Sequence, residues 1–380
     1  MKALVALMAL LYSVTLSAQE RLTLLFVGDL MQHQAQIDAA RTSEGRYDYT
    51  PCFSLVKEQI SRADLAIGNL EVTLGGEPYR GYPAFSAPDE YLQAINDAGF
   101  DILITANNHC LDRGKKGLER TILMLDSLHI PYAGTYRNLS ERKQRYPLFI
   151  HKKGFRIALL NYTYGTNGIK VSPPNIVNYI DKEIILQDIR SAQARRPDAI
   201  IACMHWGIEH QSLPNREQRE LADWLLQQGV THIIGSHPHV IQPMELRTDG
   251  TRQHVVVYSL GNFISNMHDE NTDGGLIFTL QLEKSPLPQP VRPFYSGQSR
   301  SPALESASFP FPYCRVSHCG YDLVWTARPE LTQEKNYILY PIYFSSDSLP
   351  QEARNRLKIF TENSRKLLQQ HNIDIYENKK

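Results

Sequence analysis

The sequence lacks an excess of charge of either sign. Lysine plus arginine and aspartate plus glutamate both number 40 in 380 residues, so no overall field attracts nucleic acid or an acidic membrane surface. We therefore expect no nucleic-acid partner, although a few arginines or a metal ion could still hold a local anionic substrate. Internal repeats are also absent. With 42% hydrophobic residues, the chain can bury the core of one large domain or of two smaller ones.

Long apolar runs are missing as well. The first twenty residues combine one lysine, an apolar stretch from Ala3 to Leu11 and the small residues Ser17 and Ala18, which is typical of a secretory signal. We expect residues 1–18 to be a signal peptide and the mature protein to be exported, periplasmic or extracellular. The apolar stretch is too short to span a membrane, and no later run is long enough, so we expect no transmembrane anchor in the mature chain.

Cysteine is scarce, and its spacing suggests one disulfide at most. Cys52, Cys110 and Cys203 are scattered, and only Cys314 and Cys319 lie close together in the sequence. In an exported protein these two could form a local bridge, and a buried reduced pair explains them equally well. The odd count leaves at least one thiol without an intramolecular partner.

Short apolar runs alternate with amphipathic stretches over most of the chain. Amphipathic stretches such as 117–128, 182–194 and 215–228 predict helices. The alternation predicts an α/β sheet with covering helices. Strands are predicted in the apolar runs 22–29, 63–69, 100–108, 156–163, 198–206, 231–239 and 254–262.

The last hundred residues differ from the rest of the chain in composition and periodicity. Residues 285–313 are rich in proline and serine without a period, which predicts a long loop. Beyond it, residues 337–344 predict a strand and residues 350–370 predict a helix, which we expect to pack on the main domain. The signal peptide is therefore expected to be followed by a main domain, 19–282, and a C-terminal extension, 283–380.

Polar residues gather where the apolar runs end. In open α/β sheets, ligands bind beyond the carboxyl ends of the strands, so these tips are the expected place of a functional site. Five tips carry side chains that can bind metal or move protons: Asp29; Asn69 and Glu71; Asn107, Asn108, His109 and Asp112; His205, Glu209 and His210; His237 and His239.

Each tip taken alone has a simpler explanation. Asp29 could cap a helix, turn chemistry explains paired asparagines, and His205 could pack in the core on Trp206. His237 and His239 are more informative, because Pro238 favours an extended backbone at His237, in which both imidazoles point to the same side. Imidazole is a common neutral ligand of zinc, manganese, iron and nickel. The joint occurrence of these residue types at five strand ends favours a metal site.

Six separated motifs give the sequence a resemblance to a known family. They are GDLM, GNLE, ANNHCLDRG, HWGIEH, GSHPHVIQP and YSLGNF, in that order. Over residues 22–282 the chain resembles the CapA family, which is associated with bacterial poly-gamma-glutamate capsule biosynthesis. That family in turn resembles the calcineurin-like metallophosphoesterases. The resemblance implies a four-layered α/β/β/α sandwich of metallophosphatase type, with the residues after 282 as an extension and a two-metal centre at the strand ends.

The resemblance also implies a set of ligands, with two departures. The phosphoesterase motif has a histidine where this chain has Met31, with His33 nearby, and a bridging aspartate where this chain has Asn69, with Glu71 nearby. The departures affect one of the two metal positions, so we expect one or two divalent ions, Mn²⁺, Zn²⁺ or Fe²⁺. The expected metal ligands are Asp29, Glu71, Asn108, His205, His237 and His239.

A metal centre of this kind implies hydrolysis or group transfer at a phosphoryl or acyl centre. His109 would protonate the leaving group, Asp112 would orient His109, and Glu209 would support a ligand or accept a proton. The leading interpretation is an exported CapA-like hydrolase or transferase acting on poly-gamma-glutamate or a related anionic, peptide-linked polymer of the cell envelope. Two alternatives stay open: a generic exported phosphoesterase, and a polymer-binding or assembly factor without catalysis.

Overall fold

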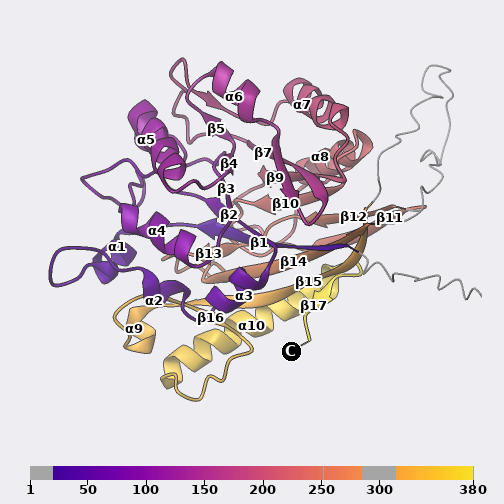
Figure 1. Ribbon diagram of the computed structural model, residues 1–380. Helices are drawn as coiled ribbons and strands as arrows, with labels where there is room; N and C mark the ends of the chain where they lie inside the picture. The colour runs from indigo at the N-terminus through magenta and orange to yellow at the C-terminus, as the bar shows by residue number, and fades with distance from the viewer. Residues whose placement is uncertain (1–19, 251, 285–313, 380) are drawn as a thin grey trace, which may run out of the picture.

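The computed structural model describes residues 20–250, 252–284 and 314–379 (Figure 1). The expected signal peptide, 1–18, and the expected proline-rich loop, 285–313, lie outside the described residues. None of the helices in the described ranges combines the length and apolar character needed to cross a membrane.

A nine-stranded sheet carries the first half of the chain and its end. Strands β1 to β4 run parallel, because each connection between them crosses over. Among the later strands, β14 pairs antiparallel with β1, β15 with β14, and β16 with β15. β13 (Asn262–Ile264) pairs with β1, and β17 (Tyr376–Glu377) pairs with β15. The order is β16 (Ile338–Pro341), β15 (Cys314–Ala327), β14 (Gly274–Lys284), β1 (Arg21–Leu30), β2 (Leu65–Leu70), β3 (Ile102–Ile104) and β4 (Tyr132–Ala133).

A six-stranded sheet carries the middle of the chain. Its four inner strands are parallel, and the two edge strands are antiparallel to them. A separate pair is formed by β5 (Thr135–Tyr136) and β8 (Ile176–Val177). The order of the six is β11 (Met244–Asp249), β12 (Arg252–Val257), β10 (His232–Ser236), β9 (Ala199–His205), β7 (Phe155–Thr163) and β6 (Leu148–Lys152).

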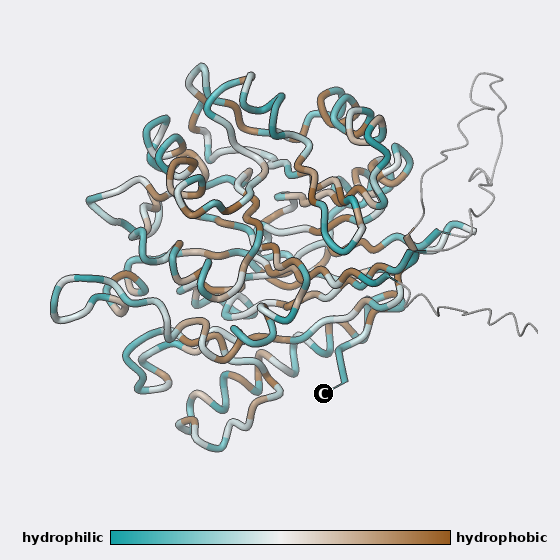
Figure 2. Tube along the Cα trace, in the orientation of Figure 1, coloured by the Kyte–Doolittle hydropathy of each residue, from teal (hydrophilic) through white to brown (hydrophobic). Residues whose placement is uncertain are grey.

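The two sheets pack face to face and are covered by helices. Leu24 and Phe26 of β1 share an apolar cluster with Ile157 and Ile201 of the second sheet, whereas Leu25 belongs to the cluster that contains the helices. Both faces of β1 are therefore buried, which explains its unbroken apolar run. Figure 1 shows the strands in the middle with the helices around them, and Figure 2 shows that the central strands are mainly hydrophobic.

The helices follow the chain in two groups that cover the two sheets. Between the strands of the first sheet come α1 (Gln34–Ala40), α2 (Thr50–Phe53), α3 (Lys57–Arg62), α4 (Asp89–Asp97) and α5 (Gly114–Ser127). α6 (Leu139–Arg145) directly precedes the second sheet, and α7 (Lys182–Ala194) and α8 (Arg216–Gln227) come between its strands. α9 (Pro329–Thr332) and α10 (Gln351–His371) lie near the end of the chain. This arrangement confirms the expected four-layered α/β/β/α sandwich with a C-terminal extension.

The extension belongs to the same sheet as the main part of the chain. β15 pairs with β14 from Lys284 to Gly274, and α10 contributes Leu357 and Phe360 to the cluster between the sheets. The predicted boundary after residue 282 falls within β14. The sequence did not predict β14 or β15, because β15 has polar residues on its exposed side and is held in place by pairing rather than by a continuous apolar run.

The cysteines form no bridge. All five lie in the described part of the chain and are free thiols. Cys314 and Cys319 are five residues apart on β15, which is about 16 Å along an extended strand. A disulfide needs a Cα separation below about 7 Å, so both thiols are reduced, as the alternative predicted, although Cys319 is only partly buried.

Candidate metal centre

The candidate centre lies where strands of both sheets end. Asp29 is at the end of β1, and Glu71 directly follows β2. His205 ends β9, and His237 follows β10. The segment after β3 adds Asn108, which is 1% exposed. Residues from five distant parts of the sequence are therefore brought to one buried place.

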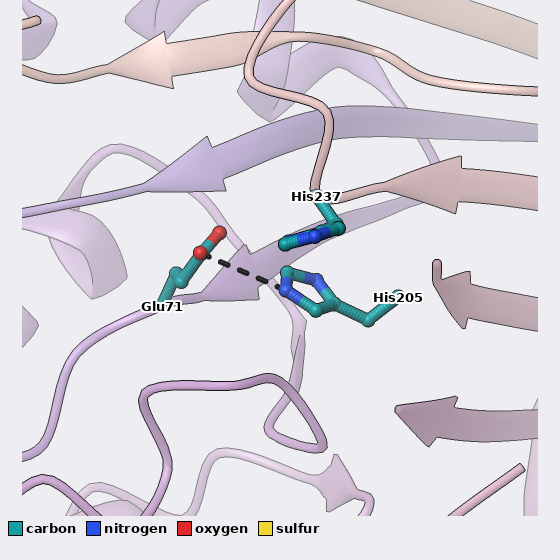
Figure 3. A group of neighbouring side chains, drawn as sticks. All are labelled: Glu71, His205 and His237. Atoms are coloured by element: carbon teal, nitrogen blue, oxygen red, sulfur yellow. Dashed lines mark ion pairs between the residues drawn. The ribbon is translucent and has the colours of Figure 1, made fainter. Parts of the chain in front are cut away.

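Glu71 is the carboxylate that two groups of residues share. It forms one group with His205 and His237 and a second with Asp29 and His239, in each of which the potential ligand atoms lie within 4.8 Å of one another. Its Oε1 is 3.7 Å from His205 Nε2 and 3.8 Å from His239 Nε2. Two ligands of one tetrahedral ion are about 3.4 Å apart, so these spacings suit a shared cation. Figure 3 shows the Glu71 carboxylate pointing toward the rings of His205 and His237.

Asn108 and Glu209 complete these groups. The Asn108 Oδ1 atom is 2.9 Å from His205 Nε2, so the amide oxygen and the imidazole nitrogen converge on one point. Glu209 is exposed, and its carboxylate forms a third group with His237 and His239. All six expected ligands thus lie in the centre, and Glu209 lies beside them rather than in the interior.

Buried atoms of the centre lack hydrogen-bond partners. Within the described part of the chain, Asp29 Oδ2, Glu71 Oε1 and His237 Nδ1 are buried and accept or donate no hydrogen bond. Buried polar atoms are almost always satisfied, and an unsatisfied carboxylate oxygen is destabilising. The donor set of two carboxylates, an amide oxygen and three imidazoles fits a divalent ion, which would satisfy these atoms.

Burial keeps two of the imidazoles neutral. Burial, followed by the charges of His237 and His239, lowers the pKa of His205 well below 6.5, and burial and His239 lower the pKa of His237 to about 3. Both rings are therefore neutral, as metal binding requires. Burial and the nearby charge of Asp29 raise the pKa of Glu71. Burial opposes ionisation of Asp29, but the neighbouring His239, whose Nδ1 lies 3.3 Å from Asp29 Oδ2, outweighs it, so the pKa of Asp29 is lowered and that of His239 is raised.

Two asparagines hold the ligands. Asn69 Nδ2 donates to Asp29 Oδ1 at 2.7 Å and to Glu71 Oε2 at 3.1 Å. The amide at position 69 thus holds the two carboxylates together, while Glu71 takes the shared position. Asn262 Oδ1 is 3.0 Å from His239 Nδ1, which leaves His239 Nε2 facing Glu71. Asn262 was not predicted, although it lies within the motif YSLGNF.

The backbone of the His-Pro-His segment differs from the prediction. His237 has φ 100° and His239 has φ 58°, so the expectation of an extended backbone at His237 is wrong. The rings nevertheless converge, with their centroids 5.8 Å apart. Positive φ is unfavourable for a residue with a Cβ and is found mainly where the surrounding structure enforces it, as at functional sites. The local preference set by Pro238 is overridden by the tertiary structure.

His109 and Asp112 form a buried pair beside the centre. His109 Nδ1 is 2.7 Å from Asp112 Oδ2, and the Phe85 N–H donates to the same carboxylate oxygen at 2.9 Å. The carboxylate therefore accepts a hydrogen bond from Nδ1 and fixes the ring, and Nε2 is left as the atom that can take up or release a proton. By contrast, His33 joins none of the three groups found among the described residues, and its Nδ1 lies 3.2 Å from both the Asn266 N atom and Gln36 Oε1.

Two glycines allow the strands of the centre to approach closely. A Cβ at Gly28 would lie 1.9 Å from the carbonyl oxygen of Gly261, and a Cβ at Gly235 would lie 2.0 Å from that of Tyr258. The structure therefore requires glycine at both positions for close backbone contact.

The chain is similar to proteins of capsule synthesis. A family model described as the bacterial capsule synthesis protein PGA_cap matches residues 23–267. The capsule biosynthesis protein CapA of Bacillus anthracis is 29% identical over 260 residues, which cover 64% of this chain and 60% of that protein. The PGA biosynthesis protein CapA of Bacillus subtilis (strain 168) is 28% identical over 275 residues, which cover 68% of this chain and 67% of that protein. The matched region is therefore only part of each relative.

Solved structures show a more distant likeness. The NAD nucleotidase of Haemophilus influenzae has 11% sequence identity and a TM-score of 0.44, over 91% of this chain and 68% of that one. The sulfate thiohydrolase SoxB of Thermus thermophilus has 12% identity and a TM-score of 0.42, over 92% and 61%. Such scores say nothing of activity.

The family model covers well over half of the 380 residues, and all six motifs of the expected resemblance lie within residues 23–267. The chain belongs to the family of bacterial capsule synthesis proteins described as PGA_cap.

Proposed function

We propose that the protein is a metal-dependent hydrolase or transferase of capsule biosynthesis. The observation that carries the proposal is the position of Glu71, whose single buried carboxylate belongs to both ligand groups. Asp29 and His239 would hold one ion with it, and Asn108, His205 and His237 would hold a second. The ions proposed are Mn²⁺, Zn²⁺ or Fe²⁺, because mixed carboxylate, amide and imidazole ligands suit these metals.

The chemistry follows from the residues beside the ligands. Divalent ions bound here would acidify a water molecule and polarise an oxygen of the substrate. His109 would give the proton on Nε2 to the leaving group, while Asp112, 2.7 Å from Nδ1, stabilises the ring as its charge changes. Glu209, exposed beside His237 and His239, would accept a proton at the rim of the centre.

The proposed substrate is poly-gamma-glutamate or a related anionic polymer of the cell envelope. The support is membership of the capsule synthesis family and similarity to two proteins named for capsule and PGA biosynthesis. An exported protein would meet such a polymer, and the sequence of residues 1–18 supports export. We also propose that the extension acts as part of the same domain, since β15 pairs with β14.

The test combines metal analysis with a cleavage assay. Purified protein should contain or bind up to two divalent ions per chain, and it should shorten poly-gamma-glutamate or transfer its ends only when loaded. His237→Ala should abolish turnover. His151→Ala is the matched control, because His151 is exposed on β6, and it should behave as wild type.

Other outcomes would identify the alternatives. Turnover of p-nitrophenyl phosphate without action on the polymer would indicate a phosphoesterase. Polymer binding that survives His237→Ala, with no turnover by wild type, would indicate an assembly factor. Either result would refute the proposed reaction.

A further inference from the structure

The loop between β7 and β8 lies against the candidate centre, although none of the sequence motifs marks it. The Tyr164 N–H donates to the His205 carbonyl oxygen at 3.0 Å, which ties the loop to the end of β9. The Tyr164 ring packs against His237 with centroids 4.5 Å apart and the planes tilted by 42°, and it lies nearly parallel to His205, at an interplanar angle of 11°. The loop therefore forms one wall beside the imidazole ligands.

Internal hydrogen bonds hold this wall in one conformation. The Thr163 hydroxyl donates to the Gly165 carbonyl oxygen at 2.9 Å, and the Thr166 hydroxyl donates to that of Ile169 at 2.7 Å. Both threonines are buried. They fix the backbone on either side of Asn167, whose φ is 49°. Asparagine adopts this left-handed conformation more readily than most residues.

Asn167 makes one contact with the ligand set. The Asn108 Nδ2 atom donates to Asn167 Oδ1 at 3.2 Å, and Asn108 Oδ1 lies 2.9 Å from His205 Nε2. The amide of asparagine is planar, with its oxygen and nitrogen on opposite sides. A partner that accepts from Nδ2 therefore decides which way Oδ1 points.

We propose that Asn167 is a positioning residue of the metal centre: by accepting a hydrogen bond from Asn108, it keeps the Asn108 amide oxygen turned toward the ion shared with Glu71, His205 and His237. The inference rests on the proposed metal centre and adds a residue to its support. Loss of the acceptor removes the Nδ2 hydrogen bond that opposes a flip of the amide, and a flipped amide would present Nδ2, which cannot bind a cation. Loss of such a supporting hydrogen bond weakens metal binding about 10-fold.

The experiment measures Mn²⁺ binding to the full chain by calorimetry, supported by the visible spectrum of the Co²⁺-loaded protein. Asn167→Gly removes the acceptor and tolerates positive φ, so the loop should keep its conformation. Asn167→Asp keeps an acceptor oxygen and should rescue binding. Lys170→Ala, at an exposed position in the same loop, is the control.

We expect Asn167→Gly to bind one of the two ions with about 10-fold lower affinity and to show a changed Co²⁺ spectrum. The affinities of Asn167→Asp and Lys170→Ala should stay within about threefold of wild type. Two ions bound by Asn167→Gly with wild-type affinities would overturn the inference alone. Failure of the wild-type chain to bind any ion would overturn the proposed centre and, with it, the inference.

Discussion

The replacement of Glu71 by glutamine gives a direct test of the shared carboxylate. Glutamine keeps the size of the side chain and an oxygen that can accept from Asn69, but it removes the negative charge. Because Glu71 Oε1 lies 3.7 Å from His205 Nε2 and 3.8 Å from His239 Nε2, the change affects both groups. We expect Glu71→Gln to bind neither ion at concentrations that saturate the wild-type protein.

The magnitude follows from binding linkage. An ion present at 100 times its dissociation constant stabilises the folded state by about 2.7 kcal/mol. Unfolding entropies of about 2.1 cal/mol/K per residue give about 0.8 kcal/mol/K for a chain of 380 residues. One ion should therefore raise the wild-type Tm by about 3 °C and two ions by about 7 °C. In Glu71→Gln this rise should be nearly absent.

The metal-free proteins should differ in the opposite direction. Burial and Asp29 raise the pKa of Glu71 in the folded state above its unfolded value of about 4.5, so the folded protein binds more protons and loses stability as the pH rises above that value. Glutamine does not titrate. Without metal at pH 8, Glu71→Gln should therefore be at least as stable as wild type.

The assay is thermal unfolding with chelator and with saturating Mn²⁺. Glu283→Gln is the control, because Glu283 is also buried but pairs with Arg21 and Arg315 away from the centre. It should keep the full metal-dependent rise. An equal rise in Tm for wild type and Glu71→Gln would refute the shared-carboxylate arrangement.

Three further predictions concern proton transfer, acid stability and packing. Asp112→Asn should lower the turnover of the metal-loaded protein about 100-fold and alter its pH profile without changing the metal content, because the amide cannot stabilise a charged His109. An unchanged pH profile would contradict this role of Asp112. Burial, followed by the charge of His254, lowers the pKa of His232 to about 3, and the Val255 N–H donates to His232 Nδ1. The contribution of neutral His232 to the free energy of unfolding should therefore be lost as the pH falls below 6.5, at about 1 kcal/mol per pH unit. Denaturant titrations of His232→Gln should show a flatter slope. Gly235→Ala should destabilise the fold by about 2 kcal/mol or more, since its Cβ would lie 2.0 Å from the Tyr258 carbonyl oxygen. Gly165→Ala is the control and should be neutral, because a Cβ there meets no described atom within 4 Å.

Much of the fold was predictable because the signals are local. The predicted runs overlap β1, β2, β3, β7, β9, β10 and β12, and the predicted amphipathic stretches overlap α5, α7 and α8. β14 and β15 were not predicted, because they are stabilised mainly by pairing with each other and with β1. Sequence patterns report burial on one face or both, but they do not report which strand supplies the partner hydrogen bonds.

The site was predictable to a similar depth. The residue types at the strand ends predicted a metal centre and named the residues that the structure gathers, including Glu71 in place of Asn69. The support was not visible: Asn262 and Asn167 act through hydrogen bonds to His239 and Asn108 across 23 and 59 residues of sequence. A single polar residue in a loop has no local signal for such a contact.

The sequence by itself determined the class of fold and the donor atoms available at the strand ends, because alternation of apolar runs and the chemistry of side chains are properties of short segments. Only the tertiary structure decided which donors face one another, since Asp29 and Glu71 come from one sheet and His205 and His237 from the other. It also imposed the positive φ of His237 and His239 against local preference. The physical reason is that close packing of the two sheets stabilises the fold enough to offset the strained backbone of these two histidines and the buried polar atoms that lack hydrogen bonds.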